Sequence, residues 1–160
     1  MTTKAQLIPA KTRERLDRLF ERFPRKPDAL LTALYMVQED CERHLPSEVL
    51  DELAAIMEMP KSIIYEVVTF YHLYSTEPRG ENIILICQNL CCYLRGSDEI
   101  YRAVREELGI GPGETTDDGR FTLETAECLA ACERAPAMMI NEETFGPLDP
   151  DQVKEILRKY

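Results

Sequence analysis

The sequence predicts two structural parts: a small helical bundle in residues 1–76, followed by a mixed α/β (α+β) domain in residues 77–160. In the first half, apolar residues recur at three- and four-residue spacing, which is the period of an amphipathic helix. From residue 82 onward, short apolar runs have the length of buried strands. Between the halves, the polar stretch STEPRGEN (75–82) contains Pro78 and Gly80, which is typical of a hinge or a domain boundary.

Four helices are expected in the first part, and prolines lie between them. Their sequences are TRERLDRLFERF (12–23), DALLTALYMVQEDCERHL (28–45), EVLDELAAIMEM (48–59) and KSIIYEVVTFYHLY (61–74). Pro24 and Pro60 follow the first and third of these segments, where a residue with a fixed φ and no N–H group ends a helix. Short helices with several apolar faces predict a small bundle, and we expect it to act as a docking element.

The second part is expected to follow the order β-α-β-β-(β)-α. The segments are NIILIC (82–87), SDEIYRAVREELGI (97–110), FTLETAEC (121–128), APAMMIN (135–141), the weak strand TFGPL (144–148) and a last helix. Phe121, Leu123 and Thr125 alternate along the second strand, so they are expected to face inward. Asp149 and Gln152 have the spacing of a capping box, which predicts the start of the last helix.

Charge and composition exclude several classes of partner. The chain has 160 residues and a formal net charge of -10, so its surface repels phosphate backbones and anionic lipids. We therefore expect no nucleic-acid partner and no direct membrane contact. No apolar run reaches the roughly 18 residues that span a bilayer, and the first residues lack the apolar core of a signal peptide. These features predict a cytoplasmic protein, in which thiols stay reduced.

Five of the six cysteines form two close groups, and each group follows a predicted strand. Cys87 and Cys92 have C-x4-C spacing with Cys91 between them, and about 35 residues later Cys128 and Cys132 have C-x3-C spacing. Loops at the ends of neighbouring strands meet in space, so the groups can form one four-thiolate site. Such a site holds zinc or an iron–sulfur cluster. Two separate, wide loops favour a [2Fe–2S] cluster, because each iron takes two thiolates, whereas zinc and a disulfide or free dithiol remain alternatives.

The motifs around these cysteines resemble one family closely. VVTFYHLY, TEPRG and NIILICQNLCCYLRG, followed by GETTDDGRFTLETAECLAACERAPAMMIN, are similar to the 24-kDa (NuoE-type) subunit of respiratory complex I, a thioredoxin-like [2Fe–2S] ferredoxin. The resemblance runs from about residue 10 to the end of the chain and is most specific in residues 68–141. It implies a thioredoxin-like [2Fe–2S] domain in residues 77–160, with one cluster held by Cys87, Cys92, Cys128 and Cys132.

The resemblance also implies a function. It predicts an electron-transfer subunit of NADH:quinone oxidoreductase, without catalytic residues of its own, that exchanges single electrons with FMN. The FMN and NAD would be bound only by a partner, the NADH/FMN-binding flavoprotein subunit. The complex would place this chain in a peripheral arm on the cytoplasmic side of an inner membrane. Related subunits serve NAD-linked hydrogenases and formate dehydrogenases, so these assemblies are alternatives within the family.

Some residues depart from the family pattern or have alternative roles. Cys91 stands where the family often has a small residue or proline, and the C-x4-C pattern favours Cys92 as the ligand and Cys91 as an extra thiol. Ala130 replaces a frequent glycine, and Cys41 is expected to be structural or exposed. A zinc-stabilised adaptor without redox function is an alternative of another class. A thioredoxin-like disulfide oxidoreductase would need a C-x-x-C motif at a helix start, which this chain lacks.

Overall fold

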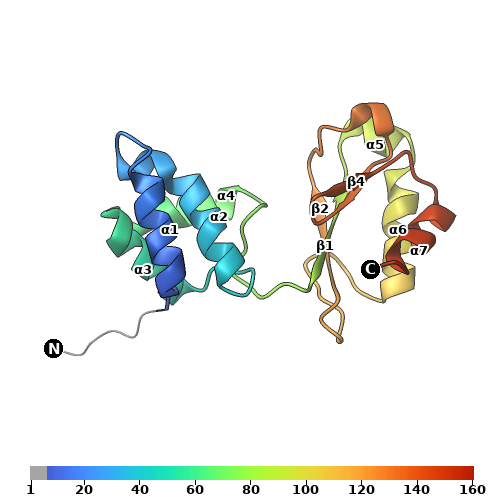
Figure 1. The fold of residues 1–160 in the computed structure, drawn as a ribbon. Coiled ribbons are helices and arrows are strands. Elements are labelled where there is room, and N and C mark those ends of the chain that lie inside the picture. The colour runs from blue at the N-terminus through green and yellow to red at the C-terminus, as the bar shows by residue number, and fades with distance from the viewer. Residues whose placement is uncertain (1–6) are drawn as a thin grey trace. The chain divides into compact units, whose positions relative to one another are not determined.

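The computed structural model describes residues 7–160, and Figure 1 shows their fold. The chain forms two compact units, of which the first ends at Pro78 and the second begins at Arg79, and each unit has a hydrophobic core of its own. The first unit is helical and the second is built on a mixed four-stranded sheet, which confirms the predicted fold class. Within the described residues, no helix has the length and apolar character needed to cross a bilayer.

Helices make up the first unit. They are α1 (Ala10–Phe20), the 3-10 helix η1 (Lys26–Ala29), α2 (Leu30–Asp40), α3 (Ser47–Met57) and α4 (Lys61–Phe70). The apolar positions of these helices point inward, so Leu16, Leu34 and Leu50 are fully buried in one core. The second helix is shorter than predicted. It ends at Asp40 because Glu42 and Arg43 adopt positive φ angles of 53° and 62°, which a helix cannot accommodate.

The second unit packs helices against a sheet of order β2-β1-β3-β4. Its elements are β1 (Asn82–Cys87), α5 (Leu90–Leu94), α6 (Ser97–Leu108), β2 (Phe121–Ala126), η2 (Cys132–Arg134), β3 (Met138–Ile140), β4 (Glu143–Phe145) and α7 (Pro150–Leu157). Strands β1 and β2 are parallel, whereas β3 runs antiparallel to both β1 and β4. Helices α6 and α7 lie side by side and pack on the sheet through a shared apolar core (Figure 1).

A local sequence signal correctly predicted the start of the last helix, whereas the burial pattern of strand β2 was predicted only in part. The predicted capping box is present, since Gln152 N donates to Asp149 Oδ1 (2.8 Å) and Asp149 N donates to Gln152 Oε1 (2.9 Å). On β2, Phe121 and Leu123 are buried as predicted and Thr125 on the same face is partly buried, but Thr122, which points to the other face, is buried as well. The Thr122 hydroxyl is satisfied in the interior by the Gly80 N–H (2.7 Å) and the Thr115 hydroxyl (2.8 Å).

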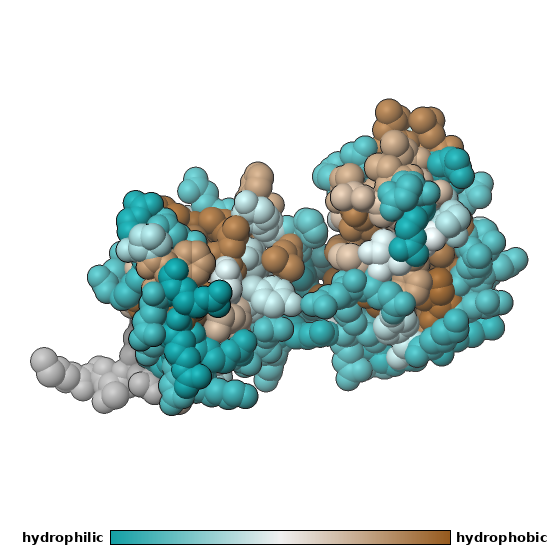
Figure 2. Space-filling view, turned by 45° about the horizontal axis from the view of Figure 1, so that its top comes forward, coloured by the Kyte–Doolittle hydropathy of each residue, from teal (hydrophilic) through white to brown (hydrophobic). Residues whose placement is uncertain are grey.

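Several large apolar side chains stay on the surface of each unit (Figure 2). On the second unit, Leu90, Tyr93 and Leu94 of α5 are exposed to 65%, 57% and 73%. On the first unit, Phe70 at the end of α4 is exposed to 78% and Leu73 to 47%. Side chains of this size are normally exposed singly, so two groups of them mark candidate contact surfaces for other proteins.

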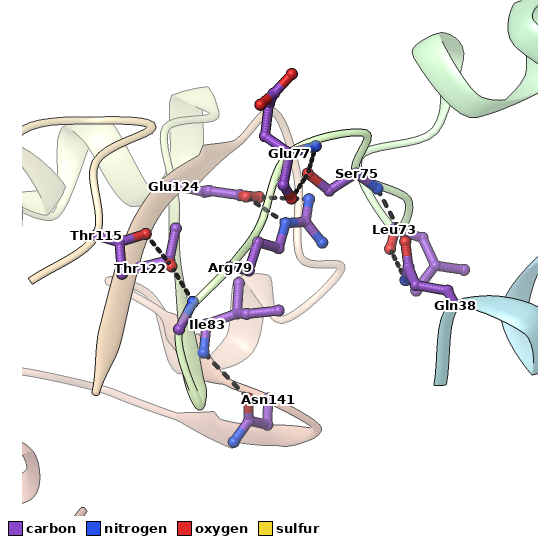
Figure 3. A network of polar contacts seen from close by, with 11 residues as sticks. Gln38, Leu73, Ser75, Glu77, Arg79, Ile83, Thr115, Thr122, Glu124 and Asn141 are labelled. Atoms are coloured by element: carbon purple, nitrogen blue, oxygen red, sulfur yellow. Dashed lines mark hydrogen bonds and ion pairs between the residues drawn. The ribbon is translucent and has the colours of Figure 1, made fainter. Parts of the chain in front are cut away.

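Polar contacts fix the chain on either side of the boundary between the units (Figure 3). In the first unit, Gln38 Nε2 donates to the Leu73 carbonyl (3.0 Å), and the Ser75 N–H donates to Gln38 Oε1 (2.9 Å). In the second unit, Arg79 Nε lies 2.8 Å from Glu124 Oε1, and the Arg79 side chain is only 7% exposed. The Ser75 hydroxyl also donates to the Glu77 carbonyl (2.8 Å) and accepts from the Glu77 N–H (3.2 Å), so local hydrogen bonds continue from Ser75 to Glu77.

Candidate metal centre

The candidate site lies at the end of the parallel strand pair. The register places Cys87, the last residue of β1, opposite Ala126, the last residue of β2. Cys128 follows two residues later, so both cysteine groups start at the same edge of the sheet. The Gln88 N–H donates to the Ala126 carbonyl (2.9 Å) and the Cys87 N–H to the Ala137 carbonyl (3.2 Å), which holds the first loop to its neighbours.

A short helix carries the second and third cysteines of the first group. Helix α5 begins at Leu90, where the sequence predicted a loop, because the Asn89 side chain accepts a hydrogen bond from the Leu90 N–H (2.9 Å). Asn89 occupies the N-cap position, where asparagine is a preferred residue, so it was the signal in the sequence that indicated a helix; its side chain bonds to the first helical N–H and not to the second or third. Successive helical residues point about 100° apart. As a result, Cys92 is 1% exposed whereas its neighbour Cys91 lies on the surface.

The second cysteine group lies in the loop that follows β2. Cys128 and Cys132 are both exposed, and Cys132 begins the 3-10 helix η2. Between them, Ala130 has a φ of 54°, a left-handed conformation that an L-amino acid other than glycine adopts at a cost. A glycine here, which the resemblance implies is frequent in the family, would adopt this conformation without strain.

The two groups start at the same end of the β1–β2 pair. Cys87 and Cys92 belong to a small apolar cluster with Ala135 and Ala137. The Cys91 thiol is the largest of the causes that raise the pKa of Cys132, and the Cys128 and Cys87 thiols add to the rise. The four residues predicted as ligands therefore stand on two loops at one end of these strands, with one pair buried and the other exposed. Cys41 belongs to the first unit, far along the chain from the other thiols.

Burial and neighbouring groups change the acidity of these thiols. Burial by itself raises the pKa of Cys87, but the N–H groups of Asn89 and Leu129 and the Cys92 thiol outweigh it and lower that pKa. Burial is the main reason that the pKa of Cys92 rises to about 11; the Ala137 N–H opposes the rise and the Cys87 sulfur adds to it. Within this pair, a negative charge is therefore stabilised better on Cys87 than on Cys92.

Backbone N–H groups point at the sulfur atoms. Cys87 accepts from Asn89 and Leu129, Cys92 accepts from Ala137, and the Ala130 N–H donates to Cys128 Sγ at 3.3 Å. Such donors stabilise thiolates and the negative charge of a metal–thiolate group, and they are a main means by which a protein tunes an iron–sulfur centre.

The donor set fits a centre with two metals. Among residues 7–160, no three His, Cys, Asp or Glu side chains approach one another closely enough to hold a single metal ion. A [2Fe–2S] cluster does not need three ligands around one point, because each of its irons takes two terminal thiolates. A buried pair on β1 and α5, an exposed pair on the β2 loop and N–H donors to three of the four sulfurs fit this requirement.

Comparison with known proteins gives a consistent result. A sequence profile of the thioredoxin-like [2Fe-2S] ferredoxin family matches residues 16–160. A subunit of an NADH-quinone oxidoreductase of Rhizobium meliloti is 39% identical over 148 residues, which cover 92% of this chain and 88% of the relative. The NADP-reducing hydrogenase subunit HndA of Solidesulfovibrio fructosivorans is 34% identical over 154 residues, covering 96% of this chain and 90% of the relative.

A solved structure has the same fold. In the crystal structure of an air-oxidised NAD+-reducing [NiFe]-hydrogenase, one chain superposes with a TM-score of 0.69 at 23% sequence identity. The match covers 82% of this chain but only 22% of the hydrogenase chain. At this identity, the likeness concerns the fold alone.

Proposed function

This chain belongs to the thioredoxin-like [2Fe–2S] ferredoxin family, which includes NuoE-type subunits of NADH-quinone oxidoreductases, and we propose that it is the electron-transfer subunit of such a complex. The observation that carries the proposal is that two loops, each with a pair of cysteines, start at the same end of the parallel strands β1 and β2. The relatives support a subunit of a multisubunit oxidoreductase, and the cysteine site would carry the electron.

The proposed ligands are Cys87, Cys92, Cys128 and Cys132. A [2Fe–2S] cluster, when bound, supplies one-electron redox chemistry. The buried Cys87 and Cys92 hold one side of the site in an apolar environment that excludes water, since Ala135 and Ala137 pack against them. The exposed Cys128 and Cys132 hold the other side, next to solvent and to any docked protein.

The N–H donors have a defined role in this proposal. The acidic side chains of the chain and the four thiolates all contribute negative charge, so they disfavour the addition of an electron. The N–H groups of Asn89, Leu129, Ala130 and Ala137 donate to three of the sulfurs and offset part of this charge. Because the donors are backbone groups in hydrogen-bonded loops, they need little rearrangement when the charge changes.

The proposed partner is the NADH/FMN-binding flavoprotein subunit of the same complex, with which the chain exchanges single electrons from FMN. The exposed apolar face of α5 supports a docking surface at the site, because Leu90 and Leu94 lie on the same short helix as Cys92. In the first unit, the exposed Phe70 and Leu73 support a second contact. In such a complex, the chain lies in a peripheral arm on the cytoplasmic side of the membrane.

A hydrogenase assembly is the second candidate. It is favoured by the 34% identity with the HndA subunit over 96% of this chain, which is close to the 39% identity with the Rhizobium oxidoreductase subunit. Both candidates use the same site and differ in the substrates of the complex, which are NADH and a quinone in one case and hydrogen and NAD or NADP in the other. Purification of the complex from its own cells, followed by assays of quinone reduction and of hydrogen oxidation with NAD or NADP, distinguishes them.

Cluster content and ligand identity are tested together. We expect a brown protein with two irons and two sulfides per chain, and an EPR signal after reduction. Serine at Cys87, Cys92, Cys128 or Cys132 is expected to alter or abolish the visible spectrum. Cys41→Ser is the matched control in the first unit and is expected to leave the spectrum unchanged. A colourless protein with one zinc ion would reject the proposal in favour of a structural metal site.

A further inference from the structure

A small hollow lies beside the exposed cysteine loop of the second unit. Three apolar side chains line it: Phe145 at the end of β4, Leu148 in the loop that follows, and Ile156 on α7. These side chains pack on the core but are only partly buried, so they keep apolar surface open to the hollow. Its volume is about 280 Å³, below the roughly 300–1,000 Å³ of sites for small molecules. The hollow therefore suits a single large side chain and is too small for a cofactor.

Hydrogen bonds join the wall of the hollow to the segment that follows Cys132. Arg134 Nε donates to the Gly146 carbonyl (3.2 Å), and the Leu148 N–H donates to the Pro136 carbonyl (3.2 Å). Arg134, which lines the hollow, ends the 3-10 helix η2 that the exposed Cys132 begins. A side chain that fills the hollow therefore lies next to the exposed side of the candidate metal centre.

Charged groups on the rim determine which side chains suit the hollow. Arg134 and Lys159 place two cations there, and Glu155 adds one carboxylate. The rim is therefore positive, although the whole chain has a net charge of -10. Because the Arg134 Nε is bonded to Gly146, the guanidinium group is held at the rim, and its Nη groups can donate to one carboxylate in the paired geometry that arginine favours.

We propose that this hollow is a docking site for an acidic, apolar segment of the protein that exchanges electrons with this chain. A large apolar side chain of that segment fills the hollow, and a neighbouring Asp or Glu pairs with Arg134. The proposal rests on the proposed function, which requires a redox partner beside the exposed cysteines. An apolar anchor in a pocket together with an arginine is the usual composition of an interface hot spot, and complementary charge adds specificity and a faster association.

A free small acid would use the same apolar and cationic groups, but the size of the hollow opposes it. Sites for small molecules bury most of the surface of the ligand, which a hollow of about 280 Å³ that is open to solvent does not do. A protein segment needs no such enclosure, because the surface around its anchor residue excludes water as well.

Photocross-linking in the intact complex tests the location and the chemistry of the occupant. The photoreactive amino acid p-benzoylphenylalanine replaces Glu155, which is exposed and lines the hollow, and the complex is purified from its own cells before irradiation. We expect a cross-link to a partner peptide in which a large apolar residue stands next to Asp or Glu. The same replacement at Lys154, which lies on α7 outside the hollow, is the matched control and should not give this peptide.

Each result of the cross-linking has a defined meaning. An intact complex without a cross-link from position 155, a partner peptide without an acidic residue, or the same peptide from position 154 would overturn the proposal. A peptide of the expected kind from a hydrogenase subunit would support the docking site and would change only the type of complex in the proposed function.

Charge variants test the role of the rim through the rate at which the cluster-loaded chain associates with the purified flavoprotein subunit. Lys159→Glu reverses a rim cation and is expected to slow association roughly fivefold at low salt. Glu155→Gln removes the opposing carboxylate and should speed association. Lys154→Glu makes the same change of charge on α7 outside the hollow and should have little effect. High salt should reduce all of these differences, because it screens exposed charges.

Equal slowing by Lys159→Glu and Lys154→Glu would overturn the proposal, since the net charge and not the hollow would then set the rate. An unchanged rate in Lys159→Glu would overturn it as well. The visible spectrum of each variant shows separately whether the cluster is present, so a failure of docking is distinguished from a failure of the metal centre. A wild-type chain that carries a cluster but does not bind the flavoprotein subunit would reject the proposed partner, and the cross-linked peptide would then decide on the docking site.

Discussion

Replacing Gly146 by alanine should damage the metal site through a clash of backbone atoms. A β-carbon at this position would overlap the Arg134 carbonyl oxygen and would lie 3.1 Å from the Pro136 carbonyl oxygen. Both obstacles are backbone atoms of the segment that follows Cys132, and neither can turn away as a flexible side chain can. The Arg134 side chain adds a further tie, because its Nε donates to the Gly146 carbonyl (3.2 Å). The whole segment must therefore move.

The expected loss follows from this geometry. Forcing extra atoms into packed structure costs about 1–3 kcal/mol, and a backbone obstacle belongs at the upper end. In a unit of about 80 residues, 3 kcal/mol corresponds to a decrease in Tm of roughly 15 °C. Gly109→Ala is the matched control: it has no atom within 4 Å of the added β-carbon, but its φ of 70° is unfavourable for alanine. That strain costs about 1 kcal/mol, or roughly 5 °C.

Thermal unfolding followed by circular dichroism measures both variants, and the visible spectrum of the loaded protein reports on the site. We expect the larger decrease in Tm for Gly146→Ala, together with a reduced cluster content, and a normal spectrum for Gly109→Ala. Equal decreases in Tm would mean that the conformational preference of glycine matters and the clash does not. An unchanged Tm and spectrum in Gly146→Ala would refute the close approach of the two segments.

Three further predictions concern other parts of the chain. Ala130→Gly should relieve the left-handed strain at φ 54° and raise the stability of the second unit by about 1 kcal/mol, seen as a higher Tm. Glu124→Gln should leave the buried Arg79 charge without its carboxylate and destabilise the second unit by about 3 kcal/mol in urea unfolding. Glu107→Gln, which removes a surface carboxylate 3.8 Å from Arg158, should change that stability by less than about 1 kcal/mol. Burial raises the pKa of Tyr74 to about 12, so the unfolded state ionises first; stability is full below about pH 10 and falls toward pH 12. The free energy of unfolding should fall less across this pH range in Tyr74→Phe than in the unchanged protein.

Local patterns in the sequence predicted most of the fold. The helical period and the prolines predicted the helices of the first unit, and short apolar runs predicted strands β1 and β2. These predictions succeed because each element is specified by residues within one or two turns of it. Helix α5 is the exception, since Asn89 indicated its start but five residues are too few to show a helical period.

The spacing of Cys87, Cys92, Cys128 and Cys132, together with the strands before them, predicted a four-thiolate site, and the resemblance of the surrounding motifs predicted the family, which the comparisons confirm. Sequence spacing shows which residues follow a strand directly and therefore lie in the loop after it. Cysteines in two such loops are enough to predict a candidate metal centre. Spacing does not record side-chain direction, so the choice between Cys91 and Cys92 rested on the resemblance to a family. The backbone donors to sulfur leave no trace in the sequence, because every residue except proline has an N–H group.

The tertiary structure decided where the two cysteine groups lie and which of their side chains are buried. The register of β1 and β2 brings Cys87 opposite Ala126, and the turn of α5 directs Cys92 into the interior and Cys91 to the surface. The strand pairing joins residues about 40 positions apart, and it depends on packing that no local segment specifies. The sequence alone therefore determined the chemistry available to this protein, and the packing of the chain decided which thiols are buried and which are exposed.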